Sequence, residues 1–279
     1  MARRSLIFCP KNIKISDRND QIGREKLPLL LAFHGGLGRP EQMEKLTGFM
    51  ALAETYGICV AYPEGIKRYW NDGRDLEKRR GIDDITFVEN LIDHLRESLP
   101  IDQKRVYACG ISNGGFFCQY LLTQSSSRFA AVASVAATVH EPMFMSLRPA
   151  EPVPIMFVVG DEDPVVPYAG GEIELAGKKS GTVVAFEQGL RYWVEHNKAL
   201  TQARESILES VVAHDPTRIR RIDFDATAGG APVVVFVVEG GGHTWPSGWQ
   251  FFRERFIGKT SRQLDASRAI LDFVMQYSK

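Results

Sequence analysis

One serine stands between glycines in the stretch Cys109-Gly110-Ile111-Ser112-Asn113-Gly114-Gly115. An apolar run precedes this stretch, and a second run over residues 116–122 follows it with the composition of a helix. A strand, Gly-x-Ser-x-Gly and a helix in succession are typical of a nucleophile elbow, whose sharp turn exposes the serine hydroxyl on a strained backbone. The pattern predicts a nucleophilic Ser112. The alternative is that the glycines only separate a strand from a helix.

A serine hydroxyl becomes a good nucleophile only when a base removes its proton. Among the six histidines, His243 follows an apolar run over residues 233–239 through three consecutive glycines. A glycine-rich loop after a late strand can bring an imidazole back over the serine. We therefore predict His243 as the general base, the alternative being an ordinary loop histidine.

A general base of this kind needs a carboxylate that fixes its tautomer and stabilises the imidazolium. The stretch Gly160-Asp161-Glu162-Asp163-Pro164 follows an apolar run over residues 155–159. Asp163 has room to reach inward before the proline turns the chain, whereas Asp161 lies closer to the strand and is suited to capping the turn. We favour Asp163. The resulting order, serine, acid, histidine, is that of α/β-hydrolases.

Acyl transfer also needs N–H donors for the oxyanion. One is the backbone N–H of the residue after the nucleophile, Asn113. The other is expected in His34-Gly35-Gly36-Leu37, which follows the apolar run over residues 27–33. Glycines there let the backbone approach the developing charge without a Cβ in the way. Gly36 and Leu37 are both candidates, and the sequence does not choose between them.

Apolar runs and amphipathic stretches alternate along the chain, which predicts a mostly parallel, doubly wound sheet. We expect one domain over residues 1–279, with insertions at 161–179 and 199–215 decorating the sheet's edge. The predicted strands cover residues 5–9, 27–33, 58–62, 105–108, 129–137, 154–160, 218–225 and 232–239, and the predicted helices cover 41–56, 85–99, 116–122, 182–197 and 263–277. A polar loop or hairpin is expected over residues 11–26.

Composition excludes several classes of function. The 279 residues include 34 basic and 34 acidic side chains, so the formal net charge is zero. No basic surface for nucleic acid or an anionic membrane is expected, and no stretch has the length of a membrane helix. The N-terminal residues lack the apolar core of a signal peptide. We expect a cytoplasmic protein, with a mature secreted form as the alternative.

The four cysteines show no CxxC or metal-type spacing. Reduced, mostly buried thiols are therefore expected. No metal and no organic cofactor is implied by any motif in the chain.

Several further motifs accompany the serine, acid and histidine stretches. They are Leu31-Ala32-Phe33-His34-Gly35-Gly36, Val60-Ala61-Tyr62-Pro63-Glu64-Gly65, Trp70-Asn71, Asp83-Asp84-Ile85, Asp163-Pro164-Val165-Val166-Pro167-Tyr168 and Gly242-His243-Thr244-Trp245-Pro246. With these motifs the chain resembles the bacterial polyhydroxybutyrate depolymerase/feruloyl esterase (LpqC-like) family of α/β-hydrolases over roughly residues 5–273. The resemblance implies an α/β-hydrolase fold, with a mostly parallel central sheet flanked by helices on both faces.

The same resemblance implies a serine carboxylesterase that uses Ser112, Asp163 and His243 and forms an acyl-enzyme. We expect short-chain or aromatic esters of the feruloyl or acetyl type as substrates. We expect His34, Trp70 and Trp245 to contact the substrate. The two tryptophans would form an apolar wall of the pocket, and the alternative for both is packing in the core.

The chain also departs from that family. Its Trp-Asn loop lacks the cysteines that secreted relatives often carry, and no appended substrate-binding domain is seen, which favours a small or oligomeric soluble ester over solid polymer. Alternatives are a polyhydroxybutyrate-oligomer depolymerase, a peptidase or acyltransferase on the same triad, or a non-catalytic binding module. The oligomeric state is left open.

Overall fold

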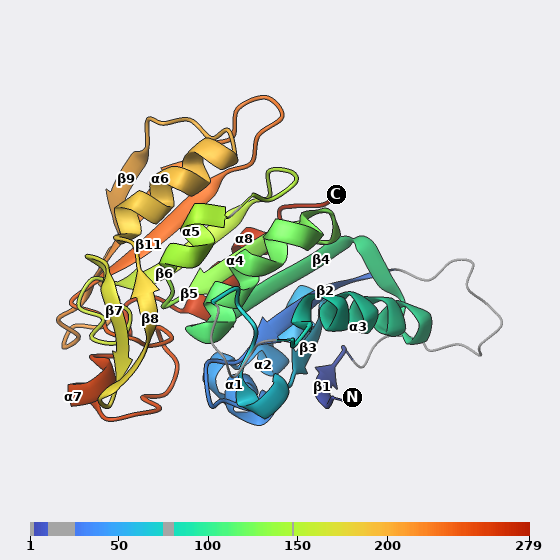
Figure 1. Cartoon of the computed structure of the whole chain (residues 1–279), viewed down its shortest axis with the longest axis horizontal. Helices are drawn as coiled ribbons and strands as arrows, with labels where there is room; N and C mark the ends of the chain where they lie inside the picture. Colours follow the sequence, from blue (N-terminus) through green and yellow to red (C-terminus); the bar gives the residue numbers. More distant parts are fainter. Residues whose placement is uncertain (1–2, 11–25, 75–80, 147) are drawn as a thin grey trace.

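A computed structural model describes residues 3–10, 26–74, 81–146 and 148–279 (Figure 1). Nine strands form one sheet in the order β1-β3-β2-β4-β5-β6-β11-β10-β9. Their bounds are β1 Ser5–Phe8, β2 Leu27–Phe33, β3 Cys59–Pro63, β4 Ile101–Ile111, β5 Ala131–Val135, β6 Ile155–Gly160, β9 Arg204–Ile207, β10 Arg218–Phe224 and β11 Val233–Glu239.

The six central strands, from β3 to β11 in the sheet order, pair in parallel. β1 pairs antiparallel with β3 at one edge, and β10 and β9 continue antiparallel beyond β11 at the other. Every residue of β3, β5 and β6 is buried, as expected for parallel strands covered on both faces. Because parallel strands share a direction, the carboxyl ends of β4, β6 and β11 lie at the same edge of the sheet.

Helices cover both faces of this sheet, which confirms the predicted architecture (Figure 1). One face packs against α3, α4 and α6, and the other packs against α1, α2 and α8. The helix bounds are α1 Pro40–Thr47, α2 Phe49–Tyr56, α3 Asp84–Ser98, α4 Asn113–Ser125, α5 Glu141–Ser146, α6 Phe186–His196, α7 Glu254–Ile257 and α8 Ala266–Val274, with short 3-10 turns η1 Ile66–Arg68 and η3 Ser126–Arg128.

Two predicted helices differ from those observed in more than the placement of their ends. The helix expected over 41–56 is two helices, because Gly48 has a φ of 61° and separates α1 from α2. The helix expected over 182–197 begins only at Phe186, since the preceding residues form β8 (Lys178–Val183), which pairs antiparallel with β7 (Gly171–Leu175). The two expected insertions thus supply the β7–β8 hairpin and the edge strand β9. The loop or hairpin predicted over 11–26 falls, apart from Lys26, outside the described residues.

The cysteine prediction was wrong for one pair. Cys9 and Cys59 form a disulfide that joins the end of β1 to the start of β3. Sequence alone missed it because the antiparallel pairing of β1 with β3 brings together two residues that are 50 positions apart. Cys109 and Cys118 are free and buried, and burial raises the pKa of both thiols. Across the described residues, we find no helix that is both long and apolar enough to cross a bilayer.

Candidate active site

Ser112 lies at a sharp turn between β4 and α4. Its φ of 55° and ψ of −121° depart from the helix and strand regions. The turn closes only over glycines, because a Cβ on Gly110 would lie 2.5 Å from the Gly114 backbone and one on Gly114 would lie 2.3 Å from the Phe33 carbonyl oxygen. The Ser112 side chain does not cap the helix that it begins. This geometry is that of a nucleophile elbow.

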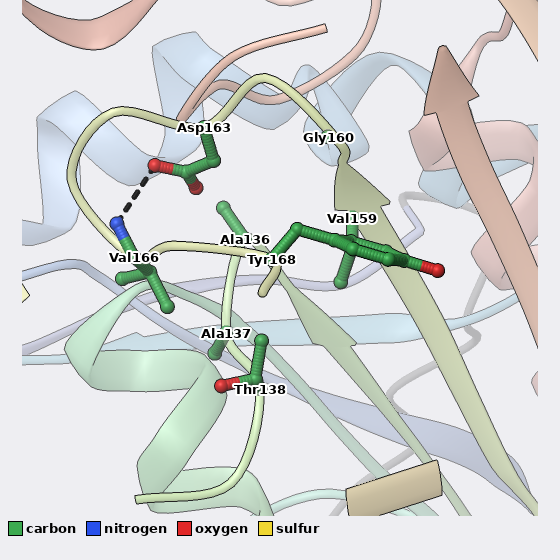
Figure 2. A pocket seen from close by; sticks show the side chains of 8 residues that line it. All are labelled: Ala136, Ala137, Thr138, Val159, Gly160, Asp163, Val166 and Tyr168. Atoms are coloured by element: carbon green, nitrogen blue, oxygen red, sulfur yellow. Dashed lines mark hydrogen bonds between the residues drawn. The ribbon is translucent and has the colours of Figure 1, made fainter. Parts of the chain in front are cut away.

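Asp163 and His243 meet where the neighbouring strands β6 and β11 end. The Nδ1 of His243 lies 2.7 Å from one Asp163 carboxylate oxygen, Oδ2. The other oxygen accepts hydrogen bonds from the backbone N–H groups of Val165 at 2.7 Å and Val166 at 2.8 Å. Figure 2 shows the bond from Val166. Both side chains are almost fully buried. The carboxylate therefore holds the imidazole proton on Nδ1 and leaves Nε2 as an acceptor.

The structure distinguishes the two candidate aspartates. Asp161 is exposed, and its carboxylate accepts a hydrogen bond from the backbone N–H of Gly240 at 2.7 Å. It links the acid loop to the histidine loop without touching the imidazole. The two loops pack so closely that a Cβ on Gly160 would lie 2.2 Å from the Gly241 carbonyl oxygen. A hydrogen bond from the Ser112 hydroxyl to the imidazole is not formed within the described residues, so the elbow alone points to Ser112.

The two candidates in the glycine loop also differ in their hydrogen bonds. The N–H of Leu37 donates to the Arg68 carbonyl oxygen at 2.8 Å, whereas the N–H of Gly36 has no acceptor within the described residues. The Gly35 carbonyl oxygen lies 2.8 Å from the Nδ1 of His34. Because the Gly35–Gly36 peptide is trans, the Gly36 N–H points away from His34. Gly36 is thus the better placed of the two donors.

Three side chains that we expect to touch substrate, those of His34, Trp70 and Trp245, are buried. His34 is 1% exposed, and its Nε2 accepts a hydrogen bond from the Gly65 N–H at 3.0 Å. The Nδ1 must then carry the proton that is donated to the Gly35 oxygen, so this imidazole is neutral. Burial lowers the pKa of His34 accordingly. The His34 ring thus fixes the glycine loop, and its contact with substrate stays a prediction.

The two tryptophans belong to the core, which was the alternative for them. Trp70 is fully buried and stacks on Phe117 at 5.1 Å between ring centroids. Trp245 is 1% exposed and donates its indole N–H to the Ser267 hydroxyl at 3.0 Å. Each ring also packs edge-on against a second phenylalanine, Trp70 against Phe33 and Trp245 against Phe49.

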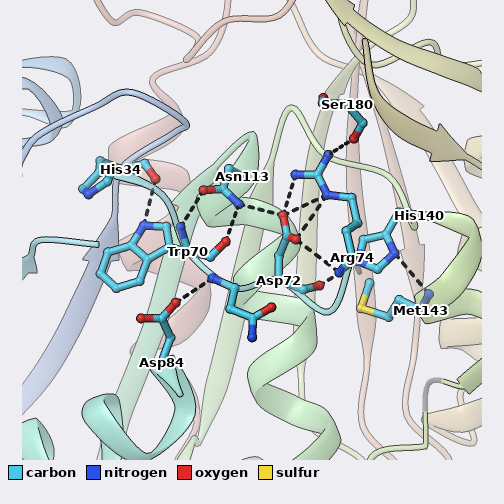
Figure 3. A network of polar contacts seen from close by, with 10 residues as sticks. His34, Trp70, Asp72, Arg74, Asp84, Asn113, His140, Met143 and Ser180 are labelled. Atoms are coloured by element: carbon cyan, nitrogen blue, oxygen red, sulfur yellow. Dashed lines mark hydrogen bonds and ion pairs between the residues drawn. The ribbon is translucent and has the colours of Figure 1, made fainter. Parts of the chain in front are cut away.

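A buried polar network beside Ser112 was missed from the sequence. Asp72 and Arg74 form a buried ion pair, and the Asp72 carboxylate accepts a hydrogen bond from the Asn113 side-chain amide at 2.6 Å (Figure 3). The Trp-Asn motif nearby was the available signal. It did not reveal the network because Asp72 and Asn113 are 41 positions apart.

Comparisons with known proteins identify relatives of this chain. The model of the prolyl oligopeptidase family (Peptidase_S9) matches residues 64–150. The protein named "Putative esterase NocK" of Nocardia uniformis subsp. tsuyamanensis is 31% identical over 259 residues, which cover 90% of this chain and 75% of that protein. The chain belongs to the α/β-hydrolase family of serine esterases. It is accordingly a serine hydrolase acting on carboxylic esters.

Other relatives of this esterase are longer or more distant. Feruloyl esterase B of Piromyces equi is 26% identical over 241 residues. The matched region covers 83% of this chain and 43% of that protein. The solved acetyl xylan esterase from Aspergillus awamori superposes with a TM-score of 0.56 at 12% identity, covering 86% of this chain and 88% of that one. That structural likeness supports the α/β-hydrolase fold.

Proposed function

We propose that this esterase hydrolyses short-chain or aromatic carboxylic esters through an acyl-enzyme, with Ser112, His243 and Asp163 as the triad. The observation that carries the proposal is the buried Asp163–His243 pair, 2.7 Å from oxygen to nitrogen, at the sheet edge where the Ser112 elbow emerges.

The reaction proceeds in two halves. The Nε2 of His243 takes the Ser112 proton as the serine oxygen attacks the ester carbonyl, and the N–H groups of Gly36 and Asn113 stabilise the oxyanion. The imidazolium then protonates the departing alcohol, leaving Ser112 acylated. Water, deprotonated by the same imidazole, attacks the acyl-enzyme and releases the acid. Asp163 keeps its negative charge throughout and stabilises the imidazolium.

The proposed acyl groups follow from the relatives. The names of matching proteins specify feruloyl esterase, acetylxylan esterase and, for a protein of Paucimonas lemoignei, poly(3-hydroxyalkanoate) depolymerase. The depolymerase is 26% identical over 114 residues, which is 39% of this chain. The alignments with the feruloyl and acetylxylan esterases are longer or more similar than this one. We therefore propose feruloyl or acetyl esters as the substrates and hydroxybutyrate oligomers as the alternative.

A hydrolysis panel tests this proposal. Purified protein is assayed with p-nitrophenyl esters of increasing acyl length, methyl ferulate, acetylated xylo-oligosaccharide and hydroxybutyrate oligomers. We expect p-nitrophenyl acetate or methyl ferulate to give the highest kcat/KM, and a preference for long fatty acyl chains would contradict the proposal.

The Peptidase_S9 match makes peptide cleavage the alternative activity. Release of the amine from a prolyl p-nitroanilide, without hydrolysis of any ester in the panel, would favour the peptidase. Failure of a fluorophosphonate probe to label the folded protein at Ser112 would instead indicate a binding module.

The disulfide bears on where the esterase works. Disulfides persist in oxidising compartments and are rare in the cytosol. The Cys9–Cys59 bond therefore supports an oxidising location rather than the cytoplasmic one expected from the sequence.

A further inference from the structure

We infer that Trp70, Asp72 and Arg74 form an oxyanion clamp, a group of positioning residues that holds the Gly36 and Asn113 N–H donors at a fixed separation. This inference rests on the proposed function. The donors come from different elements, the glycine loop after β2 and the start of α4. Stabilisation of an oxyanion requires both donors within hydrogen-bond reach of one atom, so their relative placement must be held by something else.

The first half of the clamp holds Asn113. The Trp70 backbone N–H donates to the Asn113 side-chain oxygen at 2.8 Å, and the Asn113 amide donates back to the Trp70 carbonyl oxygen at 3.0 Å. The second amide hydrogen goes to the Asp72 carboxylate. Both donors and the oxygen of this side chain are thus bonded, which fixes the orientation of the residue that follows Ser112 (Figure 3).

The second half of the clamp holds the glycine loop. The indole N–H of Trp70 donates to the His34 carbonyl oxygen at 3.1 Å. His34 in turn orients the Gly35–Gly36 peptide through its ring. One residue, Trp70, therefore contacts the segments that carry both donors, and its ring is locked by packing between Phe33 and Phe117.

The ion pair anchors the clamp. Arg74 donates through Nη2 to the Asp72 carboxylate at 2.5 Å and through Nη1 to the Ser180 carbonyl oxygen in β8 at 2.8 Å. The Asp72 carbonyl oxygen accepts from His140 Nε2 at 2.6 Å. A buried ion pair is weak support for stability because both charges lose their hydration. A role in holding geometry explains its presence beside the site better than a role in stability.

Two substitutions test the clamp, each with a matched control elsewhere. Trp70→Phe keeps a ring in the core but removes the hydrogen bond to His34. Its control is Trp193→Phe, which removes the indole hydrogen bond to Gln119 from another fully buried tryptophan. Asn113→Ala removes the reciprocal bonds to Trp70, and Asn197→Ala removes the same reciprocal pattern with the Val153 backbone.

The readouts are kcat and KM for p-nitrophenyl acetate, Tm, and the Ki of phenylboronic acid, which forms a tetrahedral adduct on the serine. We expect Trp70→Phe and Asn113→Ala to lower kcat about 10- to 100-fold, because a displacement of about 1 Å can cost 10²-fold in rate. KM should change by less than about 3-fold, since ground-state binding is unaltered. The Ki should rise by the factor by which kcat/KM falls. The controls should lower Tm comparably and leave kcat unchanged.

Two results would overturn the clamp: rate losses no larger than those of the controls at equal loss of Tm, or an unchanged Ki. If Asn113→Ala does not fold, Trp70→Phe carries the test alone. A double-mutant cycle of Asn113→Ala with Asp72→Asn adds a check, because residues that act as a unit give a combined loss smaller than the product of the single losses. Wild-type protein that hydrolyses no ester would contradict the proposed function instead, so the two failures can be told apart.

Discussion

Replacing Asp163 by Asn should abolish most activity, because the backbone orients the new amide so that it stabilises the wrong tautomer of His243. The Oδ1 of Asp163 accepts two backbone N–H groups, those of Val165 and Val166. The oxygen of an asparagine must occupy that position, because an NH₂ group there would face two donors. The amide NH₂ is then directed at the Nδ1 of His243, where the carboxylate oxygen Oδ2 now lies at 2.7 Å.

An amide donor at Nδ1 moves the imidazole proton to Nε2. The nitrogen that should accept the Ser112 proton then carries a hydrogen itself and cannot act as a base. We expect kcat to fall about 10⁴-fold, which corresponds to about 5 kcal/mol of lost transition-state stabilisation. Stability should change little, since the hydrogen bonds to Val165 and Val166 persist with an asparagine oxygen.

Asp161→Asn is the matched control, because it removes the same charge two residues away in the same loop. Its oxygen can still accept from Gly240, so we expect a loss of about 1 kcal/mol of stability or less and nearly full kcat. The assay is steady-state hydrolysis of p-nitrophenyl acetate together with thermal unfolding. A kcat for Asp163→Asn above one-tenth of the wild-type value, or an equal loss in Asp161→Asn, would refute the tautomer argument.

Three other predictions concern the nucleophile, pH and the disulfide. Ser112→Ala should lower kcat by about 10⁴-fold or more with the fold intact, and a folded variant that keeps activity in the same assay would place the nucleophile elsewhere. Burial lowers the pKa of His34, so its neutral form stabilises the fold above the unfolded-state value of about 6.5 and this contribution is lost as pH falls below it. The His196→Asn variant removes a second imidazole whose pKa is lowered by burial, so that His34 is left. Urea unfolding of this variant should show a free energy of unfolding that decreases from pH 7 to pH 5, and a flat profile would contradict the prediction. In denaturant without reductant, two thiols should titrate rather than four, and reduction should cost about 4 kcal/mol of stability for a separation of 50 residues; four titrating thiols would disprove the disulfide.

The sequence by itself determined the elements that carry the chemistry. The glycines around Ser112 allow a sharp turn between a strand and a helix, and the acid and histidine stretches each follow an apolar run. Since parallel strands end at one edge, the order of these motifs was enough to predict that they meet. The doubly wound sheet, with helices on both faces, follows from the same alternation of apolar runs and amphipathic stretches.

Only the tertiary structure shows the contacts that distinguish the near neighbours among the candidate residues. Asp163 contacts the imidazole of His243, whereas Asp161 bonds the backbone of Gly240. The N–H of Leu37 is bonded to the Arg68 carbonyl oxygen, and the N–H of Gly36 is not. These choices depend on contacts between residues tens of positions apart, and local pattern carries no information about such contacts.

The same reason explains the corrections. A tryptophan in a loop motif is compatible with a substrate wall or with the core, and only the packing of Trp70 against Phe117 selects the core. The Cys9–Cys59 bond and the Asn113–Asp72 contact likewise exist because strand pairing and the elbow bring distant segments together. Sequence specifies which side chains are available for chemistry, and the fold determines which of them share a site.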